Sequence, residues 1–319
     1  MVQRIVRKIA TAAGLLGLTG LTTAAPTSDA LLTEVSHHYA ENDGVNIHYV
    51  KTGQGPLVVM VHGFPDYWYS WREQIKALKD RFTVVAMDQR GYNKSDQPEG
   101  VAAYAMPNLV ADVAAVIRAE GASKATVVGH DWGGAVAWQV ALTLPQMVEN
   151  LVILNLPHPN GMAREMAGNE EQQRNSAYAR RFIEGSAADP KILGGYPMTA
   201  QTLANWVKDP AAKQHYEKAF TRSSFAAMLN FYKANYPRPG SESAVAPTAP
   251  PPALTMPALI LHGLEDTALH SDALNNTWDW SEKDVTIVAV PGAGHFVQQD
   301  APVLVSQTMR WWLSSRYER

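Results

Sequence analysis

The sequence predicts an α/β protein, with a mainly parallel sheet flanked by helices and an inserted helical cap. Short apolar, β-branched runs alternate with helical stretches after residue 35, which is the pattern of parallel strands joined by crossover helices. The strand signal disappears between Pro157 and about Gly240 and then returns. A chain of 319 residues with 46% hydrophobic content is long enough for one large core with an insertion.

The predicted elements follow in chain order. An alternating segment at 44–50 comes after turn residues and indicates one arm of an N-terminal hairpin. Buried strands are expected at Leu57–Val61, Phe82–Met87, Ala125–Val128, Leu151–Leu156, Ala258–Leu261 and Val285–Val290. The core is therefore assigned to residues 31–156 and 251–319. Residues 157–250 are assigned to a helical cap that ends in a Pro-rich linker, whose composition favours extended backbone.

The N-terminus has the layout of a secretory signal peptide over residues 1–25. Arg4, Arg7 and Lys8 precede an apolar stretch that ends in small residues. The stretch is shorter than the roughly 20 residues that span a bilayer. Its removal would take the formal charge from −3 to −6. We therefore expect a secreted or periplasmic protein that meets a membrane only during export; an uncleaved amphipathic helix is the alternative.

Composition excludes several classes of function. The mildly acidic balance and the lack of a basic patch argue against nucleic acid as a partner. The chain has no cysteine, which excludes disulfides, thiolate catalysis and cysteine metal sites. His37 and His38 are adjacent, so on a strand they would face opposite sides and make a poor metal pair. No metal site is expected, and the sequence leaves the oligomeric state open.

The most informative segment is Gly129-His130-Asp131-Trp132-Gly133-Gly134, between a β-branched run and a helical run. A strand that turns sharply into a helix at Gly-x-nucleophile-x-Gly presents its central residue as a nucleophile, and here that residue is Asp131. A carboxylate is ionised at neutral pH and suits displacement at the saturated carbon of an epoxide or alkyl halide. An aspartate that merely caps the helix is the alternative.

Five short motifs carry a family resemblance. They are His62-Gly63-Phe64-Pro65, Tyr69-Ser70-Trp71-Arg72, Asp88-Gln89-Arg90-Gly91-Tyr92, Gly129-His130-Asp131-Trp132-Gly133-Gly134 and Asn155-Leu156-Pro157-His158-Pro159. Together they resemble the epoxide hydrolases of the α/β-hydrolase fold over nearly all of the mature chain. The family often has glycine where this chain has Asn93, and asparagine tolerates left-handed backbone.

The fold places nucleophile, acid and histidine in that order, each on a loop after a strand. Asp266 and His295 follow the last two predicted strands. Asp131, Asp266 and His295 are thus the expected catalytic triad. The imidazole would activate water, while the acid would fix its tautomer. Glu265 is the neighbouring alternative to Asp266.

The resemblance also implies the hydrogen-bond donors of the site. Backbone amides of Phe64 and Trp132 are expected to form an oxyanion hole. Epoxide hydrolases of this family use two cap tyrosines to protonate the leaving alkoxide, and the segment 228–233 resembles the one that carries the second, at Tyr232. Tyr178 is the best match for the first tyrosine, with Tyr236 as the fallback.

The expected activity is that of an epoxide hydrolase, which converts an epoxide and water to a vicinal diol with no metal or organic cofactor. A haloalkane or haloacetate dehalogenase with the same triad is the nearest alternative. Phe64 argues against the first, since haloalkane dehalogenases usually carry Asn or Glu there, and Trp132 argues against the second, where arginine is usual. A noncatalytic exported binding protein is a third reading, which a complete triad disfavours.

Overall fold

A computed structural model describes residues 29–237 and 252–317. Its centre is an eight-stranded sheet in the order β1-β2-β4-β3-β5-β6-β7-β8, antiparallel at β1 and β2 and parallel from β4 to β8. The strands are β1 (Ser36–Asn42), β2 (Val45–Thr52), β3 (Leu57–Val61), β4 (Thr83–Met87), β5 (Ala125–His130), β6 (Val148–Leu154), β7 (Ala258–Gly263) and β8 (Val285–Val290). The predicted α/β class with the α/β-hydrolase fold is confirmed.

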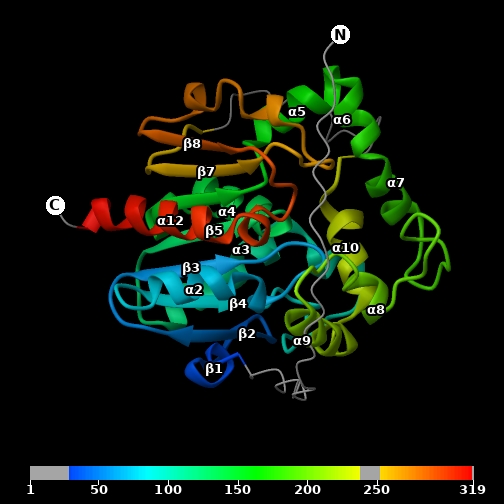
Figure 1. Ribbon diagram of the computed structural model, residues 1–319, viewed down its shortest axis with the longest axis horizontal. Coiled ribbons are helices and arrows are strands. Elements are labelled where there is room, and N and C mark those ends of the chain that lie inside the picture. Colours follow the sequence, from blue (N-terminus) through cyan, green and yellow to red (C-terminus); the bar gives the residue numbers. More distant parts are fainter. Residues whose placement is uncertain (1–28, 238–251, 318–319) are drawn as a thin grey trace, which may run out of the picture.

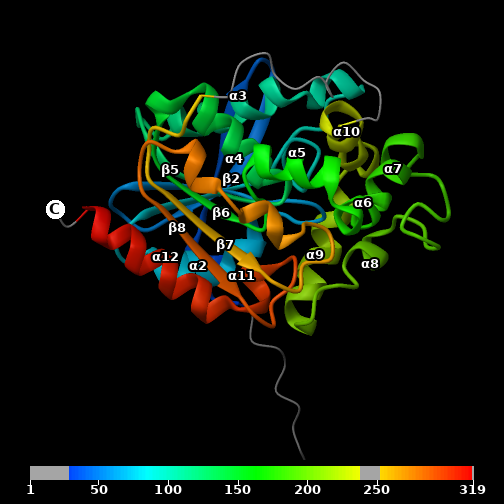
Figure 2. The ribbon, with the colours of Figure 1, turned by 90° about the horizontal axis from the view of Figure 1, so that it is seen from above.

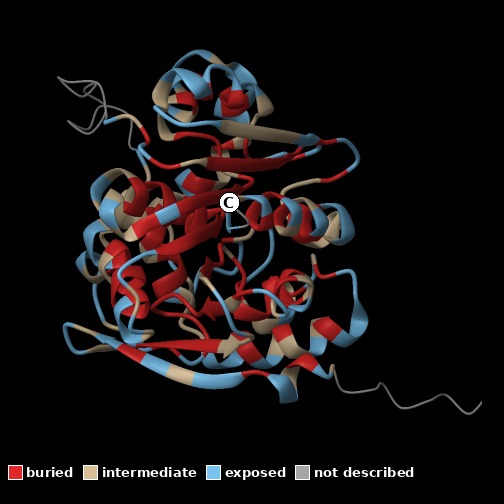
Figure 3. Ribbon diagram, turned by 90° about the vertical axis from the view of Figure 1, so that its left-hand side faces the viewer, coloured by how far each residue is buried: buried red, intermediate tan, exposed pale blue. Residues whose placement is uncertain are grey.

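Helices cover both faces of this sheet and gather beyond one end of it. The core helices are α1 (Leu31–Glu34), α2 (Arg72–Leu78), α3 (Met106–Ala119), α4 (Trp132–Thr143), α11 (Val297–Asp300) and α12 (Pro302–Tyr317). Seen from above, α2, α11 and α12 lie on one side of the strands, whereas α3 and α4 lie on the other (Figure 2). Because side chains alternate across a strand, both faces of the sheet are buried, and all residues of β5 and β7 are buried (Figure 3).

The segment between β6 and β7 contains only helices and connections over its described residues, 157–237. Its helices are α5 (Pro159–Gly168), α6 (Glu170–Asn175), α7 (Ala177–Glu184), α8 (Ala200–Leu203), α9 (Pro210–Arg222) and α10 (Phe225–Asn235). They form a layer at one end of the sheet, on the right in Figure 1. We call this layer the cap. The predicted signal peptide and most of the Pro-rich linker lie outside the described residues.

β4 begins one residue later than predicted and β7 ends two residues later, while the boundaries of β5 and β6 differ for local reasons. β5 extends two residues beyond Val128, to the residue before Asp131. β6 runs from Val148 to Leu154 rather than from Leu151 to Leu156. Its polar Asn150 is buried and hydrogen-bonds Thr126 and Tyr317, so it belongs to the strand. The strand ends before Asn155, whose φ of 40° is left-handed.

The predicted hairpin is confirmed, with strands paired from Ser36–Lys51 to Asn42–Val45. Its two turn residues, Asp43 and Gly44, have φ of 51° and 79°, as a two-residue type I′ turn requires. Asn93 also has positive φ, 46°, consistent with the expected tolerance of asparagine for this backbone. Within the described ranges, 29–237 and 252–317, no helix is long and apolar enough to cross a membrane.

Candidate active site

Asp131 occupies a sharp turn between β5 and α4. Its φ of 51° and ψ of −122° are unusual for a residue with a side chain. The neighbouring glycines allow the turn because the chain passes very close to itself. A Cβ on Gly129 would lie 2.3 Å from the carbonyl oxygen of Gly133, and one on Gly133 would lie 2.1 Å from that of Val61. The sequence therefore holds the carboxylate above the carboxyl ends of the parallel strands.

The carboxylate of Asp131 is buried between an amide and an imidazole. The backbone N–H of Phe64 donates to Oδ1 at 2.6 Å, and Nε2 of His295 lies 3.5 Å from Oδ2. Burial alone would raise the pKa of Asp131, but the hydrogen bond and charge of His295, aided by the Phe64 amide, hold it below its usual value. The group is therefore ionised at neutral pH.

The imidazole of His295 is held by Asp266. Its Nδ1 lies 2.9 Å from Oδ2 of that carboxylate, whose Oδ1 accepts backbone N–H bonds from Ala268 and Leu269 at 2.7 and 3.0 Å. Burial lowers the pKa of His295, yet the charge of Asp266 and the contacts with Asp131 outweigh burial and raise it well above normal. Glu265 is exposed and does not take this place.

His130 lies behind this imidazole, and its ring is buried in the scaffold. It is fully buried, and its Nε2 donates to the carbonyl oxygen of His295 at 2.8 Å. The two rings are 5.0 Å apart. Burial, with the charge of His295, lowers the pKa of His130 to about 4. It is therefore neutral at physiological pH and supports the loop that carries His295.

Three cap tyrosines gather above the carboxylate. The ring of Tyr232 on α10 packs edge-on against Trp132 at 5.0 Å and against Phe64 at 5.6 Å. The rings of Tyr178 on α7 and Tyr236 lie 6.0 and 6.1 Å from it. Burial raises the pKa of all three hydroxyls, and the charge of Asp131 raises each further. The phenols therefore stay protonated and can act as hydrogen-bond donors.

The oxyanion donors proposed from the sequence differ in their contacts. The N–H of Phe64 already binds Asp131. Trp132 is the first residue of α4, so its N–H has no acceptor within the helix. The N–H of Trp132 directly follows the nucleophile in the chain. The N–H of Phe64 approaches it in space, from the loop after β3. Aromatic side chains complete the enclosure: Phe182 contacts Phe64 and Tyr232 with ring separations of 5.4 and 5.0 Å.

Sequence reasoning missed two buried polar residues beside the site. Asn155 donates to Asp266 at 2.6 Å, although the sequence marked it only as part of a motif. Asp66 accepts a hydrogen bond at 2.7 Å from Tyr216 of the cap, and burial raises the pKa of Asp66 to about 8. The one sequence signal for Asp66 was its position two residues after Phe64. The contact with Tyr216 could not be predicted, because the two residues are 150 positions apart in the chain.

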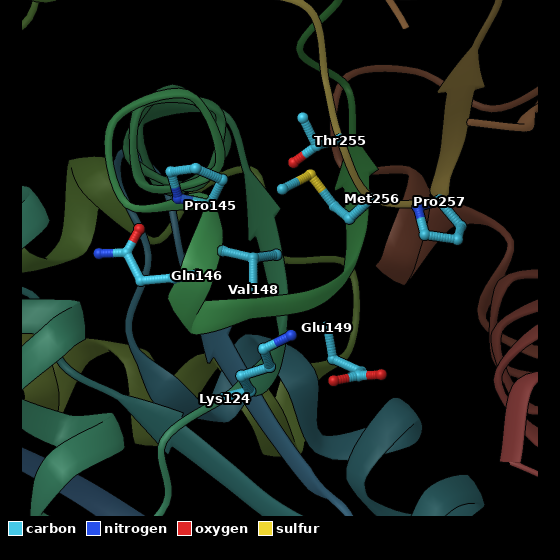
Figure 4. A pocket seen from close by; sticks show the side chains of 8 residues that line it. All are labelled: Lys124, Pro145, Gln146, Val148, Glu149, Thr255, Met256 and Pro257. Atoms are coloured by element: carbon cyan, nitrogen blue, oxygen red, sulfur yellow. The ribbon is translucent and has the colours of Figure 1, made fainter. Parts of the chain in front are cut away.

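Other features of the molecule lie away from this site. No group of three or more His, Asp or Glu side chains that could hold a metal ion occurs in the described part of the chain. A hollow of about 450 Å³ (Figure 4) opens where β5, β6 and β7 begin, at the opposite end of the sheet from Asp131. Its lining residues are Lys124, Pro145, Gln146, Val148, Glu149, Thr255, Met256 and Pro257.

Comparison with known proteins agrees with this geometry. Residues 56–302 match the family described by the alpha/beta hydrolase fold. Epoxide hydrolase 1 of Caenorhabditis elegans is 34% identical over 289 residues, which cover 86% of this chain and 70% of that protein. Epoxide hydrolase 4 of Homo sapiens is 39% identical over 296 residues, which cover 84% and 75% of the two chains.

Solved structures give the same result. A Bacillus megaterium epoxide hydrolase in complex with an inhibitor superposes with a TM-score of 0.78 at 30% identity, covering 87% of this chain and 100% of that one. Epoxide hydrolase A of Mycobacterium thermoresistibile gives a TM-score of 0.66 at 29% identity, with coverages of 88% and 98%. The chain therefore belongs to the alpha/beta hydrolase fold family and, within it, to the epoxide hydrolases.

Proposed function

We propose that this enzyme converts an epoxide and water to a vicinal diol through an ester on Asp131. The observation that carries the proposal is the pairing of an ionised, buried carboxylate with His295 on one side and protonated phenols on the other. A carboxylate can open a strained ring at carbon, and a separate imidazole can then cleave the ester. Water and a small epoxide are the only reactants that this scheme requires.

In the first step, Oδ2 of Asp131 attacks an epoxide carbon and the ring C–O bond breaks. Oδ1 is already bound by the amide of Phe64 at 2.6 Å, which leaves the other oxygen as the attacking atom. The epoxide oxygen takes a proton from a cap tyrosine, with Tyr178 and Tyr232 as the assigned acids. An alkoxide is strongly basic, so transfer of a proton during ring opening lowers the barrier.

In the second step, His295 removes a proton from water, and the hydroxide attacks the carbonyl carbon of the ester. The negative charge then develops on Oδ1, where the amides of Phe64 and Trp132 serve as the oxyanion hole. Asp266 holds the tautomer of His295 and stabilises the imidazolium. Collapse of the intermediate breaks the ester C–O bond, and the leaving alkoxide takes the proton held by His295 as the diol forms. The carboxyl proton of Asp131 passes through water to the tyrosinate, which returns Asp131 as a carboxylate and the tyrosine as a phenol.

Ester formation should prepare His295 for its role as a base. In the free enzyme, a hydrogen bond and the charge of Asp131 help raise the pKa of His295. The ester is uncharged, so these contributions are lost and the pKa should fall, which increases the neutral fraction at a given pH.

We therefore expect the rate of ester hydrolysis to fall off on the acid side of its pH profile (the acid limb). The midpoint of this limb should lie at lower pH than the midpoint of the His295 titration in the free enzyme. Single-turnover hydrolysis between about pH 5 and pH 9 gives the first value, and NMR of the imidazole gives the second. Equal values, or the reverse order, would show that Asp131 does not control this histidine.

The tyrosine assignment predicts an effect on the first step alone. Tyr232→Phe keeps the ring packed against Trp132 and removes only the hydroxyl. Single-turnover alkylation should slow by about 10-fold or more, since general acid catalysis contributes at least that much. Tyr236→Phe is the matched control and should leave alkylation nearly unchanged. A larger loss in Tyr236→Phe would transfer the acid role to that residue.

Parallel turnover of epoxides and of organohalides tests the proposed epoxide hydrolase against a dehalogenase. A Bacillus megaterium relative has been solved with its product (R)-3-[1]naphthyloxy-propane-1,2-diol, so the corresponding glycidyl ether and styrene oxide are suitable epoxide probes. Diol should form with both, with little halide released from fluoroacetate or simple haloalkanes, and Asp131→Ala should serve as the blank. Faster halide release that depends on Asp131, without diol, would overturn the proposal.

We also propose that the enzyme is exported. The support is the charged, apolar and small-residue layout of residues 1–25. Expression of the full chain in a bacterial host with two membranes should give a periplasmic or extracellular enzyme that begins near residue 25. Mass spectrometry of the N-terminus after fractionation measures both properties. Full-length protein confined to the cytoplasm would contradict export without affecting the catalytic proposal.

A further inference from the structure

Asn155 stands at the point where β6 ends, with its backbone N–H bonded to the carbonyl oxygen of Leu261 at 3.0 Å. Its φ of 40° turns the chain away from the sheet, and its side chain is fully buried. This backbone conformation aims the amide group along the end of the sheet towards the loops that carry Asp266 and His295. No step of the proposed reaction uses this residue.

Both ends of the Asn155 amide are committed to the triad loops. Its Oδ1 accepts the N–H of Gly263 at 3.1 Å, which fixes the orientation of the amide. Its Nδ2 therefore faces Oδ2 of Asp266 and donates to it at 2.6 Å. The same nitrogen lies 3.3 Å from the carbonyl oxygen of Gly294, the residue before His295. One side chain thus spans the acid loop and the histidine loop.

The carboxylate of Asp266 depends on this donor. Oδ1 is bound by two backbone N–H groups, and Oδ2 is shared by Nδ2 of Asn155 and Nδ1 of His295. Hydrogen bonds to an ionised carboxylate stabilise its charge and restrict its rotation. Without the amide, Oδ2 would have His295 as its one remaining side-chain donor.

We propose that Asn155 is a positioning residue for ester hydrolysis, because it holds the Asp266 carboxylate in the orientation that directs His295 towards the ester. This inference rests on the proposed two-step reaction. Asn155 does not touch the epoxide carbon or the attacked carbonyl. Its removal should therefore spare alkylation of Asp131 and act on the second step.

The direction of the pH effect follows from the charge on Asp266. With one donor fewer, the carboxylate carries less-compensated charge and binds the imidazolium of His295 more tightly, so His295 should lose its proton at higher pH. The acid limb of ester hydrolysis should then move upwards. The titratable groups that face His295 are Asp131, Asp266, His130 and His262, and Asn155 variants leave all four in place.

Two variants and one control test this inference. Asn155→Ala removes the amide, and Asn155→Gly removes it too while adopting the φ of 40° without strain. Asn150→Ala is the control, because Asn150 is also a buried asparagine of β6 but bonds Thr126 and Tyr317 at the far end of the strand. Single-turnover alkylation and ester hydrolysis are measured separately across pH, with thermal unfolding as a check on folding.

Both Asn155 variants should slow ester hydrolysis by about 10-fold or more, with alkylation changed far less, and should shift its acid limb to higher pH. Asn150→Ala should leave both steps and the pH profile unchanged even if it unfolds at lower temperature. If Asn155→Ala does not fold, Asn155→Gly decides the result. Normal hydrolysis with an unshifted limb, or equal slowing of both steps, would overturn the inference. Failure of the wild-type enzyme to form an Asp131 ester would instead refute the proposed function.

Discussion

His295→Gln should trap the enzyme as a stable ester on Asp131. Attack by the carboxylate needs no proton from His295, so mixing with an epoxide should still consume one equivalent of substrate. Hydrolysis should fall by about 10³-fold or more, because water loses its general base and only the oxyanion hole formed by the Phe64 and Trp132 amides remains. Mass spectrometry of a digest should show the peptide that contains Asp131 heavier by the mass of the epoxide.

The controls separate this outcome from simple loss of structure. Glutamine is close to histidine in volume and can still donate to Asp266, which lies 2.9 Å from the imidazole, so the fold should be retained. Asp131→Ala should give no adduct, and the wild-type enzyme should give one only transiently. An unmodified Asp131 peptide in His295→Gln, with substrate binding shown independently, would contradict the assignment of the nucleophile.

The turn at Asp131 and the closeness of Asp131, Asp266 and His295 were predictable, because they follow from local patterns and one topological rule. Gly129 and Gly133 mark a turn that a larger residue could not enter. The carboxyl ends of parallel strands meet at one edge of a sheet, so residues that follow such strands converge wherever they stand in the chain. The rule therefore predicts that Asp266 and His295 lie near Asp131, although they follow it by more than 130 positions in the chain, and the structure has them in contact.

The cap shows where such prediction ends. Helical periodicity indicated helices there, but it gives no rule for which tyrosines meet. Tyr178 and Tyr236 lie almost equally far from Tyr232, at 6.0 and 6.1 Å between rings, and this arrangement depends on the packing of α7 against α10. Contacts between buried polar side chains are equally non-local, as the bonds from Asn155 to Asp266 and from Tyr216 to Asp66 illustrate.

The second large effect is expected from Gly133→Ala, which adds a single methyl group to the elbow. That Cβ would lie 2.1 Å from the carbonyl oxygen of Val61 and 2.5 Å from that of His62. Both are backbone atoms at the end of β3, so no side chain can rotate to relieve the overlap. Either α4 or the strand must move, and each movement separates Asp131 from the Phe64 amide, now at 2.6 Å.

Gly133→Ala should therefore lower the free energy of unfolding by about 1–3 kcal/mol, and it should slow alkylation of Asp131 by about 100-fold because a displacement near 1 Å is costly at a reacting centre. Gly168→Ala is the matched control: it ends α5, and its new Cβ would meet nothing within 4 Å. This change should raise the free energy of unfolding by up to about 1 kcal/mol without altering either step. Denaturant unfolding and single-turnover alkylation measure the two effects. Since Gly133 touches no substrate, normal alkylation in a folded Gly133→Ala variant would mean that the close approach of α4 to β3 does not position the nucleophile.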